Sequence, residues 1–361
     1  MSAQPRRVAE LDRGALLAKV EGAEPVRESS VAGMDFSGAN ISGAIYEKVS
    51  CQGCRFIAAA MKDCTVVGCD FSGADFTKAD FTDTLFVDCV FDDAVFAGAL
   101  LGGVPVRGGS ARRADFTAAD LRDAVFNRCD LSAARLGAAR LEAIAVIECT
   151  TTAIDLSGAD LLRTLFADVD LTQASVAGLR AEETVFHKAR LAGLDLSGLE
   201  LIRSQFMEAD LSGANLSQTR LAQSGFKGAT LVGATLAGAM AANALFIEAD
   251  LSAATLQGAD LTQALFVDAV AVGARFSNAK LVQAIFHRAR CASAAFDGAD
   301  LEYADFSHAD LSGSVFSANH WLRTKFHGSR RDGVSLPAGA SILYDDPELA
   351  AAESWPTAQR S

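Results

Sequence analysis

The chain has 361 residues, of which 50% are hydrophobic, and it carries a net charge of −13. The apolar content supplies a long core, while the acidic balance disfavours non-specific binding to nucleic acids or to anionic membranes. No uncharged segment reaches the roughly 18 residues of a transmembrane helix, and the first residues lack the apolar stretch of a secretory signal. We therefore expect no membrane span, a cytoplasmic location and reduced cysteines.

Residues 1–28 precede the regular pattern of the chain, and we expect them to cap the fold. Within segment 8–20, apolar residues such as Leu11 and Leu16 recur near helical spacing, which predicts a short helix.

A five-residue repeat begins after this segment. The stretch ADLSGANLSQ at 209–218 contains two near-copies of one unit, with Leu211 and Leu216 as their central residues. Central residues, mostly Leu or Phe, recur from Val31 to Phe326 at every position ending in 1 or 6, which makes 60 consecutive units. The residue two places before the centre is usually Ala. Repeats of this kind indicate a solenoid.

A period of five is explained if four units make one four-sided coil of 20 residues. Side chains 20 residues apart would then stack on one face, and a three-sided coil would instead repeat at 15. Phenylalanine occurs at the 20-residue spacing without a gap, at Phe166, Phe186, Phe206, Phe226, Phe246, Phe266, Phe286, Phe306 and Phe326. We therefore predict an all-β solenoid of roughly 15 parallel coils over residues 29–329, each coil burying its core against its neighbours.

The A(D/N)LXX pattern resembles that of the pentapeptide-repeat family. The resemblance covers about residues 31–328. It implies a right-handed quadrilateral β-helix with type II and type IV turns.

Two segments depart from the pattern. Residues 98–113 hold several glycines and Pro105 but keep the five-residue phase, so they form either one degenerate coil or a projecting loop. Residues 330–361 leave the repeat, and Asp346-Pro347-Glu348 is a good helix start. This segment, which includes Trp355, is interpreted as a cap, a dimer contact or a tail.

The cysteines and histidines do not predict a reactive centre. Cys54, Cys64 and Cys69 occupy the inward slot that Ala usually fills, where a buried thiol behaves as a small hydrophobe. The five histidines are scattered, and His287 and His327 are two coils apart. We expect no metal, no cofactor, no catalytic residue and no enzymatic activity.

One part of the repeat is strongly acidic, with eight aspartates against Lys78 in residues 63–93. These aspartates, named here the acidic patch, are Asp63, Asp70, Asp75, Asp80, Asp83, Asp88, Asp92 and Asp93.

Apolar residues also flank the phenylalanine column in slots that should be polar. They are named here the apolar stripe, and they are Leu165, Val185, Met207, Leu245, Ile247, Leu265, Val267 and Ile285. They either tuck against the ladder, where such residues favour β-structure, or form a flat docking face for a protein partner or a second copy.

These features favour a non-enzymatic scaffold for protein–protein interaction, with homodimerisation as one form of it. The family resemblance implies two settings. One is an accessory or effector role in bacterial secretion, since residues 16–43 look like the helix-then-repeat entry of pentapeptide proteins associated with type VI secretion. The alternative is a DNA mimic of the quinolone-resistance type that binds DNA gyrase, for which only the acidic patch has the required charge density. Neither setting involves direct nucleic-acid binding.

Overall fold

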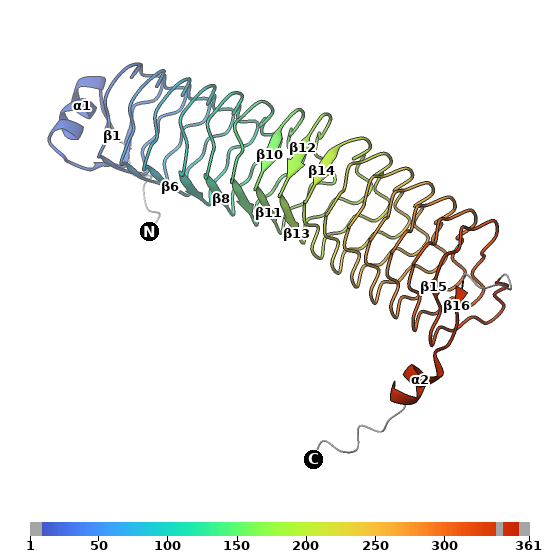
Figure 1. Cartoon of the computed structure of the whole chain (residues 1–361). Helices are drawn as coiled ribbons and strands as arrows, with labels where there is room; N and C mark the ends of the chain where they lie inside the picture. Colours follow the sequence, from blue (N-terminus) through green and yellow to red (C-terminus); the bar gives the residue numbers. More distant parts are fainter. Residues whose placement is uncertain (1–8, 337–341, 354–361) are drawn as a thin grey trace, which may run out of the picture. The chain divides into compact units, whose positions relative to one another are not determined.

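The computed structural model describes residues 9–336 and 342–353 (Figure 1). The chain divides into two compact units, Met1–Arg190 and Leu191–Ser361, and each is described by itself. Both consist of parallel 20-residue coils, and the described residues make about 16 turns in all, close to the number that the repeat predicts.

The first unit begins with a short strand and a helix. Strand β1 (Ala9–Glu10) pairs in parallel with β3 (Ser29–Ser30), and helix α1 (Arg13–Glu21) lies between them in the chain. The helix begins later than the sequence indicates because the side chain of Asp12 accepts the N–H of Ala15 at 2.8 Å and so forms the N-cap.

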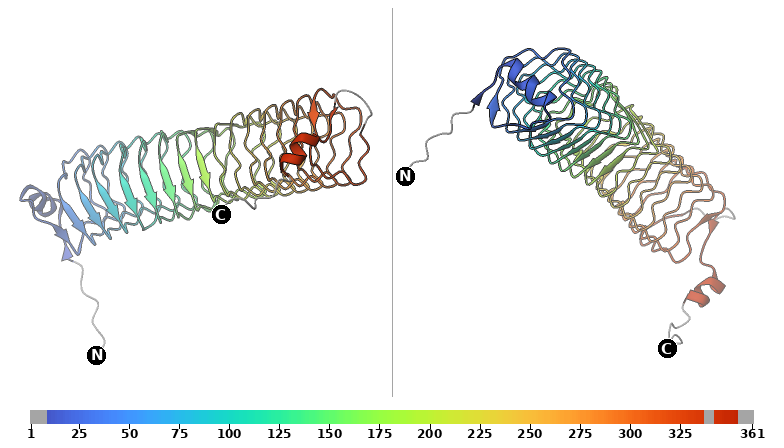
Figure 2. Two further views of the ribbon diagram at one scale, coloured as in Figure 1. Left: turned by 60° about the horizontal axis from the view of Figure 1, so that its bottom comes forward. Right: turned by 90° about the vertical axis from the view of Figure 1, so that its left-hand side faces the viewer.

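Nine strands of the first unit form one parallel sheet, one strand from each successive coil (Figure 2). They are β2 (Val26–Arg27), β4 (Ile45–Glu47), β5 (Thr65–Val67), β6 (Leu85–Val87), β7 (Pro105–Arg107), β8 (Val125–Asn127), β9 (Ala145–Ile147), β11 (Leu165–Ala167) and β13 (Val185–His187). Strands β10 (Asp160–Leu162) and β12 (Arg180–Glu182) pair in parallel on another side. Partners in both sheets are 20 residues apart, as in Tyr46–Val66.

The second unit contains β14 (Glu200–Ile202), β15 (Thr324–Lys325), β16 (Ile342–Leu343) and helix α2 (Pro347–Glu353). Elsewhere its coils are joined by single parallel bridges between residues 20 apart. The bridges Leu245–Leu265, Asp250–Val270, Thr255–Arg275 and Asp260–Lys280 follow one another at intervals of five. Four bridges per coil show that the coil has four sides.

The central residues form the core, as the repeat predicts. All of them from Val31 to Phe186 in the first unit, and from Leu191 to Phe316 in the second, are buried. Within the second unit the rings of Phe206, Phe226 and Phe246 stack nearly parallel with centroids 4.9 Å apart. The 20-residue ladder is therefore a continuous stack of aromatic side chains in this unit.

Each unit of the repeat ends in a tight turn that explains its composition. At Leu231, the N–H of Ala234 donates to the carbonyl of the central residue at 3.0 Å, and Gly233 has a φ of 66°. A type II turn needs a positive φ at its third residue, which Gly adopts without strain. Asp210, directly before the centre, accepts the N–H of Ser212 at 3.0 Å and braces the turn.

Residues 98–113 form a coil of the regular length. Strand β7 lies within it, paired with β6 on one side and β8 on the other. Pro105 is the first residue of the strand, a position that tolerates its missing N–H.

The C-terminal segment folds back onto the second unit. Strand β16 pairs in parallel with β15 through Thr324–Ile342 and Lys325–Leu343. Helix α2 follows it with Asp346 as the N-cap, as the sequence predicts, whereas Trp355 lies outside the described residues. Neither of the two helices that the structure describes is long and apolar enough to cross a membrane.

Candidate functional site

The aspartates of the acidic patch that directly precede a central residue form hydrogen bonds within the turns. Asp75 Oδ1 accepts the N–H of Thr77 at 3.0 Å and its hydroxyl at 2.6 Å. Asp70 and Asp80 form the same pair of bonds with the residue two places on. These carboxylates stabilise turns and are only half-exposed.

Three aspartates of the patch are neutralised by side chains of neighbouring coils. The ion pairs are Lys62–Asp80 at 2.7 Å, Arg112–Asp92 at 2.5 Å and Arg113–Asp93 at 2.6 Å. Counting charges within 63–93 alone misses all three cations. Asp63, Asp83 and Asp88 are exposed, and their side chains form no hydrogen bond or ion pair in the described part of the chain. The patch is therefore less acidic than its sequence indicates.

The apolar stripe falls into separate groups. In the first unit, Leu165 and Val185 pair across strands β11 and β13. In the second unit, Leu245, Leu265 and Ile285 are joined by successive bridges. These five side chains are half-buried.

The remaining members of the stripe are in the second unit. Ile247 and Val267 are half-buried, and they occupy equivalent slots in adjacent coils. Met207 is 41% exposed, and Lys227 occupies the equivalent slot of the coil between Met207 and Ile247. The continuous part of the stripe in this unit therefore consists of Leu245, Ile247, Leu265, Val267 and Ile285.

The cysteines are all free and buried, and several have a role beyond filling space. The Sγ of Cys149 accepts the N–H of Cys129 at 3.3 Å and donates to the carbonyl of Phe126 at 3.5 Å. The thiol of Cys149 thus bridges Phe126 and Cys129, the first and last residues of a turn in the preceding coil. The hydroxyl of Thr84 does the same between Cys64 and Met61. The sequence signal for this role is Cys or Thr in the slot that Ala usually fills.

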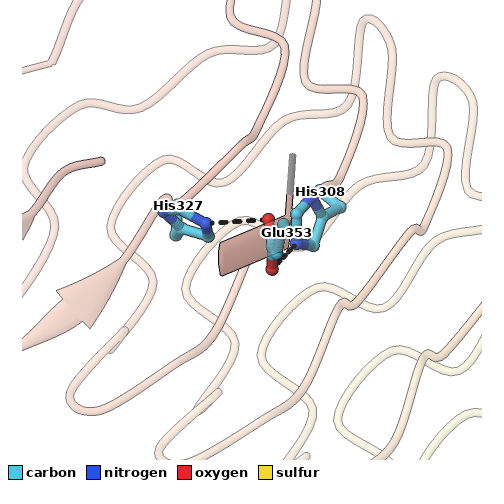
Figure 3. Close-up of side chains that lie close together, drawn as sticks. All are labelled: His308, His327 and Glu353. Carbon is cyan, nitrogen blue, oxygen red and sulfur yellow. Dashed lines mark hydrogen bonds and ion pairs between the residues drawn. The ribbon is translucent and has the colours of Figure 1, made fainter. Parts of the chain in front are cut away.

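Two histidines and a glutamate meet beside the C-terminal segment (Figure 3). The Nε2 of His308 lies 3.3 Å from Oε1 of Glu353, and the Nε2 of His327 lies 3.2 Å from Oε2 of the same carboxylate. His327 is only 6% exposed. We name these three residues the His–Glu cluster. The expectation of scattered histidines is wrong for this pair because the two residues lie on adjacent coils, where the N–H of His308 donates to the carbonyl of His327 at 2.8 Å. Helix α2 then brings Glu353 to both of them.

A cavity of about 490 Å³ lies next to the His–Glu cluster. Charged side chains in its lining are paired with each other: Asp305 contacts His287 at 3.1 Å and Lys325 at 3.4 Å. Burial raises the pKa of Asp305, but hydrogen bonds from Ser307 and the adjacent His287 imidazole outweigh this effect and hold the pKa below its usual value.

Models of pentapeptide repeats match the chain over most of the coils. The model of a pentapeptide repeat region matches residues 59–136. The model of pentapeptide repeats in eight copies matches residues 35–73, 164–201, 184–223, 204–240, 229–266, 249–288 and 282–317. A comparison with curated proteins finds no match.

Several solved structures resemble the chain. A pentapeptide repeat protein of the Arabidopsis thaliana thylakoid lumen is 31% identical over 26% of this chain and 65% of its own length, with a TM-score of 0.25. HetL is a pentapeptide repeat protein involved in heterocyst differentiation regulation in the cyanobacterium Nostoc. It is 18% identical over 87% of this chain and 96% of its own length, with a TM-score of 0.17. The plasmid-mediated fluoroquinolone resistance protein QnrB1 is 21% identical over 57% of this chain and 92% of its own length, with a TM-score of 0.27.

With TM-scores this low, the solved structures do not indicate a function for this chain. The matched repeat models extend over more than half of the residues. This chain belongs to the pentapeptide-repeat family.

Proposed function

We propose that the protein is a non-enzymatic scaffold that binds a protein partner through the apolar stripe of its second unit. The observation that carries this proposal is the ladder of half-buried apolar side chains at Leu245, Leu265 and Ile285. The corresponding slots on the opposite side of these coils are held by Thr235, Thr255 and Arg275, so the two sides differ in character. A contiguous apolar surface of this kind marks an interaction site.

A flat row of parallel bridges suits a partner with a flat apolar surface. The side chains on it are short and branched, so docking costs little side-chain entropy. The partner is a different protein or a second copy of this chain. The setting that we propose is an accessory or effector role in bacterial secretion, on the resemblance of residues 16–43 to the entry of pentapeptide proteins of type VI secretion systems.

The double variant Leu245→Asp with Leu265→Asp tests the docking surface. The matched control is Thr235→Asp with Thr255→Asp, which adds the same charges to the opposite side of neighbouring coils. Both variants should melt close to the wild-type temperature. Only the stripe variant should lose a self-associated species in size-exclusion chromatography or a protein retained in a pull-down. Equal behaviour of the two variants would count against the stripe.

The alternative function, mimicry of DNA towards gyrase, needs unpaired carboxylates in a regular array. Ion pairs already occupy Asp80, Asp92 and Asp93, which favours the scaffold over the mimic. We expect no inhibition of gyrase supercoiling at micromolar protein. If inhibition is seen and disappears when Asp75, Asp80 and Asp88 become Asn, the mimic replaces our proposal.

A further inference from the structure

We propose that His308, His327 and Glu353 bind a divalent transition-metal ion such as Zn²⁺, which fastens the C-terminal segment to the coils of the second unit. Two imidazole nitrogens and one carboxylate oxygen are donor types that Zn²⁺ takes in proteins. One donor atom from each of the three residues lies within 4.8 Å of the others. The repeat places His308 and His327 on adjacent coils, but it gives no indication of Glu353, which comes from a segment outside the repeat.

The distances within the cluster suit a tetrahedral ion. Metal–ligand bonds of about 2.0–2.1 Å place neighbouring ligand atoms about 3.3 Å apart. The two contacts of Glu353 have this length, 3.3 Å from Oε1 to His308 and 3.2 Å from Oε2 to His327. Because they involve different oxygens, the carboxylate must turn so that one oxygen faces both imidazole nitrogens. The rings of His308 and His327 are nearly perpendicular at 86°, with centroids 5.4 Å apart. Ligand atoms of the two histidines lie within 4.8 Å of each other. Coordination therefore requires movement of His308 and of Glu353, whose side chains are 40% and 43% exposed.

The neighbouring cations do not oppose the ion. Lys325 lies 3.4 Å from Asp305, and Arg288 forms two hydrogen bonds with Asp268 at 2.8 and 2.7 Å. The lysine and the arginine that line the adjoining cavity are thus paired within the second unit, and Arg331 pairs with Asp345 at 3.1 Å. The adjoining cavity of about 490 Å³ leaves room for a water molecule as the fourth ligand.

One contact must change when the ion binds. The backbone N–H of Asp346 donates to Nδ1 of His327 at 3.1 Å, so the proton of the neutral ring is on Nε2. Coordination through Nε2 moves this proton to Nδ1, which then needs an acceptor. The carboxylate of Asp345 is held by two neighbours of His327: its Oδ1 accepts the N–H of Gly328 at 2.8 Å, and its Oδ2 pairs with Arg331 at 3.1 Å. Metal binding should therefore shift the backbone around Asp345 and Asp346.

The test uses the untagged full-length protein after treatment with a chelator. Zn²⁺ binding is measured by calorimetry, and Co²⁺ binding by its visible absorption, which distinguishes nitrogen and oxygen ligands from the thiolates of the cysteines. The variants are His308→Ala and Glu353→Gln, whose side chains are about half-exposed and whose replacement leaves the core intact. The control is His320→Ala, an exposed histidine of the same unit outside the cluster.

We expect one equivalent of ion with a spectrum of nitrogen and oxygen ligands in the wild type and in the control. Each of the two cluster variants should weaken binding by about tenfold or more. Zn²⁺ should also slow amide exchange in residues 342–353 of the wild type but not of Glu353→Gln. The proposal is overturned by the absence of saturable binding, by equal affinity in the cluster variants, or by a thiolate spectrum.

Discussion

Asp92 and Arg112, 20 residues apart in the sequence, lie side by side on adjacent coils of the first unit. The Nε of Arg112 donates to Oδ2 of Asp92 at 2.8 Å, and its backbone N–H donates to Oδ1 at 3.0 Å. The Asp92 side chain is 10% exposed, so this carboxylate depends on its partner for the hydrogen bonds that water would otherwise supply. A charge that counts as part of an acidic surface in the sequence is thus a buried contact between coils.

Replacing Asp92 with Asn should destabilise the first unit by about 1–3 kcal/mol, because a charge-assisted pair becomes a neutral contact that satisfies Arg112 poorly. The matched control is Asp93→Asn. Asp93 pairs with Arg113, but both side chains are more than half exposed, so water screens the pair and the stability should change little. Urea denaturation of the three proteins makes the comparison. Equal losses of stability in Asp92→Asn and Asp93→Asn would show that the burial of Asp92 does not strengthen its ion pair.

The pH dependence of the same variant follows from the pKa of Asp92. Burial raises this pKa, but hydrogen bonds from Arg112 and Ser110 and the charge of Arg112 outweigh it and hold the pKa below its usual value of 3.8. A lowered pKa stabilises the folded state above the unfolded-state value, and this contribution is lost as the pH falls through the folded-state pKa. The stability difference between wild type and Asp92→Asn should therefore be constant above about pH 5 and shrink below pH 4. A difference that grows on acidification would contradict this assignment.

The sequence predicts the coils because their cause is local and repeated. A central residue such as Phe246 must face the core, and any slip by one residue would expose it, so the five-residue phase fixes the register. The same reasoning could have found the pair of Asp92 and Arg112, since the 20-residue spacing makes them neighbours. The His–Glu cluster could not be predicted in this way. Glu353 lies outside the repeat, and its position depends on how the C-terminal segment folds back.

The repeat pattern does not predict the hydrogen bonds of Thr84, because the slot two places before a central residue indicates only a small side chain that points inward. Its hydroxyl accepts the N–H of Cys64 at 3.1 Å and donates to the carbonyl of Met61, so it completes a turn of the preceding coil. Thr84→Ala leaves both buried backbone groups without a partner and should cost about 1–3 kcal/mol. Thr84→Ser keeps the hydroxyl and should retain most of the stability. Chemical denaturation compares the two variants, and amide exchange at Cys64 reports the turn directly; equal stabilities would refute the bridging role.

Gly109, in segment 98–113, lies directly against the backbone of the neighbouring coil. A Cβ at this position would lie 1.9 Å from the carbonyl oxygen of Cys89, and its φ of +74° is in the left-handed region. Gly103, in the same segment, has a similar φ of +70° but open space around the Cβ position. Gly103→Ala should therefore cost only the conformational strain of about 1–2 kcal/mol. Gly109→Ala adds a clash with the backbone of the neighbouring coil, so its melting temperature should fall clearly further. If both variants melt together, close approach of the two coils at Gly109 does not limit stability.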